Sequence, residues 1–349
     1  MSEAVTANIQ DYYGKVLSDS NDLQTTACCN PNDMPKWQKD ILASIEDEVL
    51  AKFYGCGSPI PPAIKGKTML DLGSGSGRDV YMLSKLAGEE GKVIGIDMTD
   101  EQLEVARKHE KEQMRTFGYK KSNVKFVKGF MERLDEAGIE DDSIDVVTSN
   151  CVLNLSTDKK KVFAEIFRVL KTGGELYFSD VFADKRIPAE HFEDEVLAGE
   201  CLAGALYIED FRRMLREIGC LDYRVIEKSV IEITNEKIHE KLGMIKFYSI
   251  TIRAFKLAES VEDICEDYGQ VATYKGTIEH MPHDFMLDDH HLFVKGKPML
   301  VCGNTYAMLN ETRYAEHFEF QGDRSVHYGP FDCGPDDLQG PETAPASCC

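Results

Sequence analysis

The stretch Asp71-Leu72-Gly73-Ser74-Gly75-Ser76-Gly77-Arg78 is the most informative in the chain. It ends an apolar run, residues 67–73, that has the composition of a buried strand. It also opens a segment, residues 77–88, with helical periodicity and a terminal glycine. Glycines let the backbone turn tightly and approach a ligand, and the first turn of a helix presents its N–H groups to that ligand. The stretch is therefore predicted to be a ligand-binding loop between a strand and a helix.

Strand-like and helical patterns alternate beyond this loop. The predicted helices span residues 99–118, 156–174 and 208–219, the second ending at the pair Gly173–Gly174. The predicted strands span residues 92–98, 123–129, 143–150 and 175–181, followed by an antiparallel edge pair at 222–234 and 244–257. Strands that alternate with helices indicate βαβ units, so we expect an α/β fold with a mostly parallel, doubly wound, Rossmann-like sheet.

Three regions are predicted along the 349 residues. Residues 1–65 form an N-terminal helical segment, in which residues 36–55 have apolar side chains at helical spacing. Residues 66–257 form the α/β domain that contains the glycine loop. Residues 258–349 have shorter strand-like runs and one helix, which predicts a smaller mixed C-terminal domain with a tail ending in Cys348–Cys349.

The charge balance excludes some classes of partner. Acidic residues outnumber basic ones by 61 to 40, giving a formal net charge of -21, which would repel nucleic acid and anionic membranes. No stretch approaches the 18 or so apolar residues that a membrane helix needs. The N-terminal residues lack the basic and apolar parts of a secretory signal, so we expect a cytoplasmic protein, and we expect it to be a monomer.

The residues around the loop indicate which ligand it binds. Asp97 ends the next predicted strand about 20 residues after the last loop glycine, where nucleotide-binding folds place a carboxylate on ribose hydroxyls. Arg78 replaces the third glycine of the dinucleotide fingerprint, which disfavours a nicotinamide dehydrogenase. The loop resembles motif I of S-adenosylmethionine-dependent methyltransferases, which have a class I methyltransferase fold. That resemblance predicts that the cofactor is bound by Asp71, Gly73, Ser74, Gly75, Gly77, Asp97, Met98, Phe130, Met131 and Asn150.

For some of these residues, a purely structural role is an alternative to cofactor binding. Phe130 and Met131 follow the strand at 123–129 and would also suit ordinary core packing. Asn150 would also suit a turn at the end of a strand. Three tyrosines are candidates for covering the sulfonium through cation–π contact, with packing as the alternative: Tyr12, Tyr13 and Tyr54.

The cysteines suggest what accepts the methyl group. The chain has 11 cysteines and no Cys-x-x-Cys, so neither a zinc ribbon nor a thioredoxin-type motif is present. We see no histidine or carboxylate obviously placed as a base at the ends of the strands at 143–150 and 175–181. Cys151 stands there instead, and Cys201 lies in GECLAGALY. Upstream, Cys56 lies in YGCG and Cys28 in LQTTACC.

These motifs together resemble the arsenite methyltransferases. The resemblance is carried by DYYGKVL, LQTTAC, YGCG, DLGSGSGRD, IDMT, SNCVLNL, KTGGELYFSD and GECLAGALY, and it persists in GQVATYKGT and FVKGKPMLVCGNT. It implies four functional cysteines, Cys28, Cys56, Cys151 and Cys201. It also implies S-adenosylmethionine as methyl donor, a thiol reductant such as glutathione or thioredoxin, and no metal-ion cofactor. Arsenite and methylarsenite are the implied substrates, in arsenic detoxification, with mono- and dimethylated products and trimethylated ones left open.

The chemistry of arsenic agrees with this set of residues. Arsenic(III) is soft, prefers thiolate sulfur and takes three such ligands while keeping a lone pair that can attack a methyl group. No proton has to be removed, so no general base is needed. Our hypothesis is that Cys56, Cys151 and Cys201 hold arsenite, and that Cys151 and Cys201 suffice for methylarsenite. Cys28 would deliver arsenic or form a transient disulfide.

Several alternatives remain at the sequence level. Cys29 or the pair Cys348–Cys349 could replace Cys28, and Ile245 and Lys246 stand where some relatives have another cysteine, which puts a disulfide from that strand in doubt. The histidines at 280, 283, 290 and 291 suit a solvated loop better than a metal site. Two other functions compete: a methyltransferase for a small organic acceptor, and a thiol protein that binds arsenic or a heavy metal without catalysis.

Overall fold

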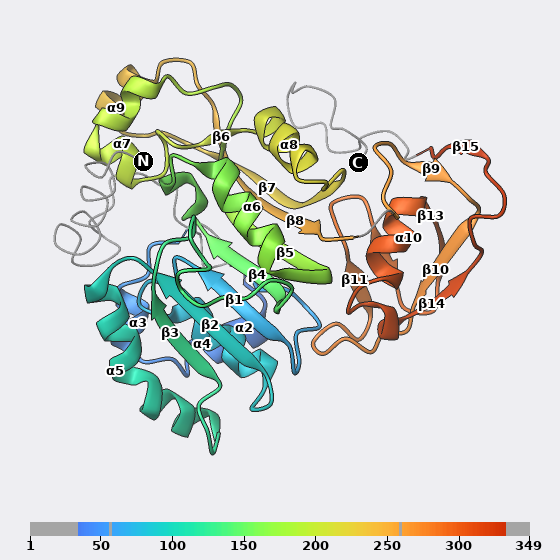
Figure 1. Ribbon diagram of the computed structural model, residues 1–349, viewed down its shortest axis with the longest axis horizontal. Helices are drawn as coiled ribbons and strands as arrows, with labels where there is room; N and C mark the ends of the chain where they lie inside the picture. The colour runs from blue at the N-terminus through green and yellow to red at the C-terminus, as the bar shows by residue number, and fades with distance from the viewer. Residues whose placement is uncertain (1–33, 56–57, 258–259, 333–349) are drawn as a thin grey trace.

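The computed structural model describes residues 34–55, 58–257 and 260–332 (Figure 1). Five residues or pairs singled out in the sequence lie outside these ranges: Tyr12–Tyr13, Cys28, Cys29, Cys56 and Cys348–Cys349. No helix in the described ranges has both the length and the apolar character to cross a membrane.

A single large sheet forms the centre of the molecule (Figure 1). Its strands lie in the order β3-β2-β1-β4-β5-β8-β7, with the short β6 paired to β5. The pairs from β3 to β5 are parallel, whereas β5–β8 and β8–β7 are antiparallel, as predicted for the edge. The bounds are β1 Thr68–Leu72, β2 Lys92–Asp97, β3 Val124–Lys128, β4 Ile144–Asn150, β5 Leu170–Ala183, β6 Leu206–Tyr207, β7 Tyr223–Ile231 and β8 Phe247–Phe255.

Helices cover both faces of this sheet, which accounts for the continuous apolar character of its strands. Met69 and Leu70 are neighbours on β1 but belong to the cores on opposite faces. One face packs against α2 Lys36–Leu42, α3 Asp47–Ala51, α4 Arg78–Ala87 and α5 Asp100–Phe117. The other face packs against α6 Lys159–Val169 and α8 Ile208–Glu217. The doubly wound α/β fold is therefore confirmed.

A third apolar cluster covers the carboxyl edge of the sheet. It contains residues of α7 Glu195–Gly199 and α9 Glu236–Leu242, together with Cys151 and Cys201. Between β5 and α7 lies a short 3₁₀ helix, Ala189–Glu193. The two cysteines are thus brought together by a segment that crosses the ends of the strands (Figure 1).

Some predicted boundaries were wrong. The helical pattern at 36–55 is divided into α2 and α3, because the Gln113 amide of α5 bonds the backbone at the break: it donates to Ser44 O at 2.8 Å and accepts from the Glu46 N–H at 3.3 Å. The helix predicted from 156 begins at Lys159, after the 3₁₀ turn Leu153–Leu155, because the Asp158 side chain caps it.

The prediction that the pair Gly173–Gly174 ends a helix was wrong, because the pair lies within β5. Helix α6 stops at Val169, and β5 begins at the next residue. The Gly173 N–H donates to Lys256 O at 2.7 Å, and the Lys256 N–H donates to Gly174 O at 2.9 Å. These bonds extend the pairing of β5 beyond the end of β8. The φ of Gly173 is +80°, which explains why glycine stands at this irregular point.

The C-terminal region is built of short antiparallel strands around one helix, as the sequence suggested. A three-stranded sheet has the order β13-β10-β14, and two-stranded pairs form between β11 and β12 and between β9 and β15. The bounds are β9 Glu266–Asp267, β10 Gln270–Tyr274, β11 Asp284–Met286, β12 Leu292–Val294, β13 Pro298–Val301, α10 Gly303–Asn310, a 3₁₀ turn Ala315–His317, β14 Phe318–Gln321 and β15 Gly329–Pro330.

Buried charges join this region to the large sheet. Arg253 of β8 donates to Glu175 at 2.6 Å, to Leu287 O at 2.7 Å and to the Tyr314 hydroxyl at 2.7 Å. Arg313 pairs with the same Glu175 carboxylate. The Arg253 and Glu175 side chains are almost fully shielded from solvent. The junction therefore contains a buried ionic network in addition to apolar packing.

Candidate active site

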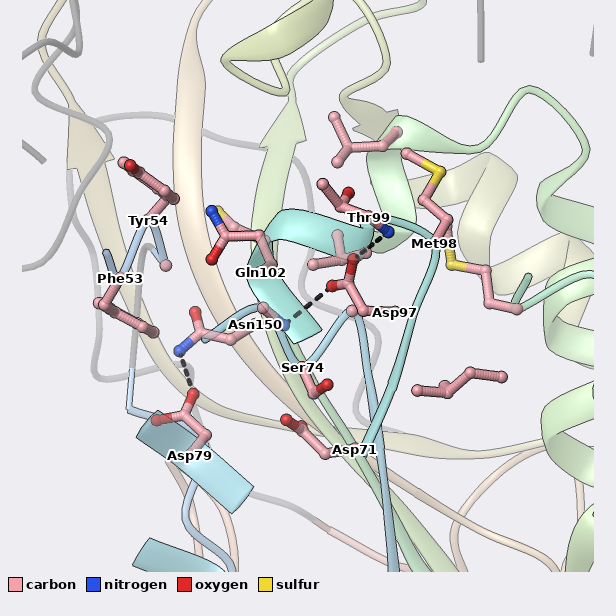
Figure 2. Close-up of a pocket in the computed structure, with 18 of the residues that line it drawn as sticks. Phe53, Tyr54, Asp71, Ser74, Asp79, Asp97, Met98, Thr99, Gln102 and Asn150 are labelled. Carbon is pink, nitrogen blue, oxygen red and sulfur yellow. Dashed lines mark hydrogen bonds between the residues drawn. The ribbon is translucent and has the colours of Figure 1, made fainter. Parts of the chain in front are cut away.

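A cavity opens at the carboxyl ends of β1, β2 and β4 (Figure 2). Open α/β sheets bind ligands at this edge. The predicted cofactor residues that line it are Asp71, Gly73, Ser74, Gly75, Asp97, Met98, Phe130, Met131 and Asn150. Gly77 does not line it. Gly77 precedes α4 with a φ of +93°, and a Cβ there would come within 2.9 Å of Phe126, so it serves the turn and the packing below the loop.

The glycine loop is held close to the neighbouring strand ends. The Gly75 N–H donates to Asp97 Oδ2 at 2.8 Å, and the Thr99 N–H donates to Asp97 Oδ1 at 2.8 Å (Figure 2). Gly73 has a φ of +66°, and a Cβ there would lie only 2.3 Å from a methyl group of Val152. A larger residue at 73 is therefore excluded both by backbone conformation and by space.

Carboxylates gather on one side of the cavity. Asp71 accepts a hydrogen bond from Thr148 Oγ1 at 2.7 Å, while Asn150 donates to Asp79 Oδ2 at 2.9 Å (Figure 2). Burial, and then the nearby Asp79, raise the pKa of Asp71 well above its usual range. Burial also raises the pKa of Asp97. A cationic ligand would relieve this concentration of negative charge.

These features fit S-adenosylmethionine. Its sulfonium and ammonium groups are cationic and its ribose carries hydroxyls, which match the carboxylates around the cavity. The Ser74 hydroxyl is buried and has no hydrogen-bond partner among the described residues, so it can bond a ligand. Tyr54, the candidate for covering the sulfonium, also lines the cavity.

Cys151 and Cys201 meet at the rim of this cavity. Cys151 follows β4 directly and lines the cavity, whereas Cys201 comes from the segment after α7. They are 7% and 3% exposed, and the Cys201 thiol donates to the Cys151 carbonyl at 2.9 Å. Both have a positive φ, +58° and +64°, a strained conformation that is concentrated at functional sites. Two residues 50 apart in sequence are thus held together at the cofactor's edge.

The sequence reasoning missed a third member of this group, Asp180. From the sequence we saw no carboxylate obviously placed as a base at the ends of β4 and β5, but an Asp180 oxygen and the two cysteine sulfurs all lie within 4.8 Å of one another. Asp180 accepts from Asn154 Nδ2 at 2.7 Å and from the Val181 N–H at 2.8 Å. Burial raises its pKa to about 7. A charged residue inside an otherwise apolar strand was a signal that could have pointed to Asp180. It was not used, because the strand continues past Asp180 to Ala183, so Asp180 does not stand at the end of the strand.

A lysine completes the polar surroundings of the cysteines. Lys159 Nζ donates to Ser156 O at 2.7 Å, and burial lowers its pKa to about 8. Its cationic form is favoured by the charges of Asp180 and Cys201. Cys151 is disulfide-bonded in this structure, so this form has to be reduced before both cysteines can bind a thiophilic ligand.

Other suggested sites have different surroundings. Among the described residues, three metal-ligating groups come together only at Cys151, Asp180 and Cys201. His280 instead stacks on Trp37, with ring centroids 4.6 Å apart, and His291 bonds Asp288 at 2.7 Å. Ile245, at the position where some relatives have cysteine, packs against the cluster that contains Cys201.

The fold and the loop define an S-adenosylmethionine-dependent methyltransferase of class I. A family model described as a methyltransferase domain matches residues 64–219, and one described as an arsenite methyltransferase C-terminal domain matches residues 268–337. An arsenite methyltransferase from Aquipseudomonas alcaligenes is 50% identical over 98% of this chain and 99% of its own length. The human arsenite methyltransferase is 41% identical over 90% of this chain and 83% of its own.

A solved structure agrees with these relatives. The crystal structure of an arsenic(III) S-adenosylmethionine methyltransferase from Chlamydomonas reinhardtii is similar with a TM-score of 0.82 and 52% identity, covering 86% of this chain and all of that one. The chain therefore belongs to the arsenite methyltransferase family, and it is an S-adenosylmethionine-dependent enzyme.

Proposed function

We propose that this protein transfers methyl groups from S-adenosylmethionine to arsenic(III) held by cysteine thiolates. The observation that carries the proposal is the pairing of Cys151 and Cys201 at the rim of the cofactor cavity, with their sulfurs and Asp180 within 4.8 Å. Soft thiolate sulfur is the donor that trivalent arsenic prefers. The relatives named above act on the same substrate.

S-adenosylmethionine supplies a methyl group on a positively charged sulfur. The chain's part is to place an arsenic lone pair in line with that methyl group, at the approach of about 3–3.5 Å that such a displacement needs. Arsenite exchanges its hydroxyls for cysteine sulfurs, and each hydroxyl leaves as water with a thiol proton. We assign this binding to Cys56, Cys151 and Cys201 for arsenite, and to Cys151 and Cys201 for methylarsenite.

Transfer of a methyl cation to the arsenic lone pair oxidises arsenic by two electrons. A thiol reductant must return those two electrons, becoming a disulfide, before a second methyl group can be accepted. The disulfide-bonded state of Cys151 supports a need for such a reductant, of the glutathione or thioredoxin type. Cys28 belongs to this part of the proposal, as the cysteine that delivers arsenic or enters a transient disulfide.

The remaining parts of the proposal are coarser. We assign mono- and dimethylated arsenicals as products, in arsenic detoxification by a cytoplasmic monomer without a metal-ion cofactor. The excess of acidic residues argues against a polyanionic partner.

The test is to incubate the purified protein with S-adenosylmethionine, arsenite and a dithiol. Arsenic species are then separated by chromatography with elemental detection. We expect methylated arsenic from the wild type and from Cys220→Ser, whose thiol is buried away from the cavity. We expect none above background from Cys151→Ser or Cys201→Ser. Binding of S-adenosylmethionine without any methylated arsenic would favour a small organic acceptor, and failure to bind it would favour a non-catalytic thiol protein.

A further inference from the structure

A second pair of buried cysteines lies in the C-terminal region, outside the residues that line the cofactor cavity. Cys265 immediately precedes β9, and Cys302 is the N-cap residue of α10. They are 5% and 1% exposed, and their sulfur atoms lie 3.0 Å apart. Cys265 is itself disulfide-bonded, whereas Cys302 is a free thiol. A thiol is therefore in contact with a sulfur of an existing disulfide.

The distance is suited to a reaction between these sulfurs. A covalent S–S bond is about 2.05 Å long, so the two sulfurs are in contact without being bonded. Reacting atoms in a productive arrangement lie about 3–3.5 Å apart, which includes the observed 3.0 Å. Disulfides exchange by attack of a thiolate on one of their sulfurs, so Cys302 is placed as the attacking group.

Hydrogen-bonding groups of α10 and β7 surround the Cys302 sulfur, and its thiol donates to Thr305 Oγ1 at 3.3 Å. Its sulfur accepts a hydrogen bond from the Thr305 N–H at 3.4 Å, at the positive end of α10. Arg224 Nη2 of β7 lies 4.0 Å from the same sulfur. That guanidinium is buried and held in position by Asp222 at 2.8 Å and Asp288 at 3.3 Å.

Cys220 is a buried thiol that faces acceptors instead of N–H donors. Cys220 faces the carbonyl oxygens of Asp222, at 3.2 Å, and of Phe255, at 3.9 Å, rather than a cation. Burial, and then the charge of Asp222, raise the pKa of Cys220 to about 12, so it stays protonated. Of these two thiols, only Cys302 faces N–H donors and a disulfide sulfur.

We propose that Cys265 and Cys302 form a thiol–disulfide exchange site in the C-terminal region. The Cys302 thiolate attacks the Cys265 sulfur, the Cys265–Cys302 bond forms, and the cysteine previously bound to Cys265 leaves as a thiolate and takes up a proton. One disulfide is broken and one is made, so the step needs no external oxidant or reductant. The step needs only Cys302 and the disulfide of Cys265, and it does not rest on the methylation chemistry.

The test uses the full-length protein, reduced and then reoxidised with glutathione disulfide. The protein is held at pH 8, quenched with acid, alkylated in denaturant and digested with trypsin without reduction. Lys275 lies between the two cysteines, so trypsin separates them and a Cys265–Cys302 bond appears in mass spectra as a linked pair of peptides. We expect this linked pair alongside a second species in which Cys265 is joined to its other partner, and we expect the two to interconvert at constant total disulfide.

Cys302→Ser is the decisive variant, because serine is a preferred N-cap residue and keeps the helix end satisfied. In this variant we expect Cys265 to be joined only to its other partner, with complete loss of interconversion. Cys220→Ser is the matched control and should behave as the wild type. The proposal is overturned if Cys302 is alkylated in every wild-type molecule, or if no Cys265–Cys302 bond forms on reoxidation. Near-identical thermal melting of the variants shows that any loss is not due to unfolding.

Discussion

The two buried cysteine pairs, Cys151 with Cys201 and Cys265 with Cys302, differ most in the groups that lie beside their sulfur atoms. The first pair faces the Asp180 carboxyl, has Lys159 nearby and borders the cofactor cavity. The second pair faces the Arg224 guanidinium at the junction between β7 and α10. Both are almost fully shielded from solvent, so these charges act with little screening.

This difference suits the two pairs to different roles. The pair Cys151 and Cys201 is suited to binding a ligand, and the pair Cys265 and Cys302 is suited to a reaction between its own sulfurs. Cys151, Asp180 and Cys201 bring two sulfurs and a carboxylate oxygen within 4.8 Å of one another, an arrangement that a thiophilic ligand can occupy once Cys151 is reduced. The Cys302 thiol, by contrast, lies 3.0 Å from the sulfur of a disulfide-bonded cysteine, so it has a reaction partner without any ligand. Similar burial and the same residue type therefore support binding in one region and exchange in the other.

The largest effect should come from removing the cation of the second pair. Arg224→Met leaves the carboxylates of Asp222 and Asp288 buried without their guanidinium, and breaking such a pair costs about 3–5 kcal/mol. We expect a loss of this size in the free energy of unfolding, measured by urea titration. Arg216→Met is the control, because the Arg216 and Asp263 side chains are 36% and 61% exposed and their pair should contribute less than about 1 kcal/mol. Equal losses in the two variants would mean that the buried cluster does not hold the junction.

A smaller, pH-dependent effect should come from the anion of the first pair. Burial raises the pKa of Asp180 from 3.8 to about 7, so the folded protein binds this proton more tightly than the unfolded chain does. The stabilisation is complete below about pH 4 and is lost as the pH rises to about 7. Asp180→Asn does not titrate, so its stability relative to the wild type should increase by about 2–3 kcal/mol between pH 5 and pH 8.

Urea titrations at the two pH values check this, with Asp210→Asn as control. The hydrogen bond and charge of Arg186, with Arg213, lower the pKa of Asp210, so both pH values lie above it. Its substitution should therefore shift stability by the same amount at pH 5 and pH 8. A pH-independent difference for Asp180→Asn would show that its carboxyl titrates as an exposed one does.

The sequence was informative where the chemistry is local. The glycine loop and Asp97 belong to one βαβ unit, so nearby residues define both. All of the predicted cofactor residues except Gly77 line the cavity. Cys151 was recognisable because it directly follows a strand end. The alternating pattern predicted a mostly parallel sheet with an antiparallel pair at its edge, which the structure confirms, whereas the order of the strands came from the structure alone.

Contacts between residues that are far apart in the sequence could not be predicted. Asp180 meets Cys201 only because the segment after β5 returns across the sheet edge. Cys265 and Cys302 are 37 residues apart, and Arg253 meets a tyrosine 61 residues away. The break between α2 and α3 depends on Gln113, more than 60 residues further along. In each case the fold selects one partner from many of the same type, and no local pattern indicates which.

The smallest effect concerns a third arsenic ligand in addition to Cys151 and Cys201. Cys56, which lies outside the described residues, is our candidate for the third arsenic ligand, and only arsenite offers three exchangeable positions. Methylarsenite offers two, which Cys151 and Cys201 can fill without it. In Cys56→Ser we therefore expect the rate with arsenite to fall roughly tenfold more than the rate with methylarsenite, equivalent to about 1.4 kcal/mol. Initial rates measured separately on the two substrates, with Cys220→Ser as control, check this. An equal loss on both would mean that Cys56 acts in both steps, and that Cys151 and Cys201 are not a sufficient pair.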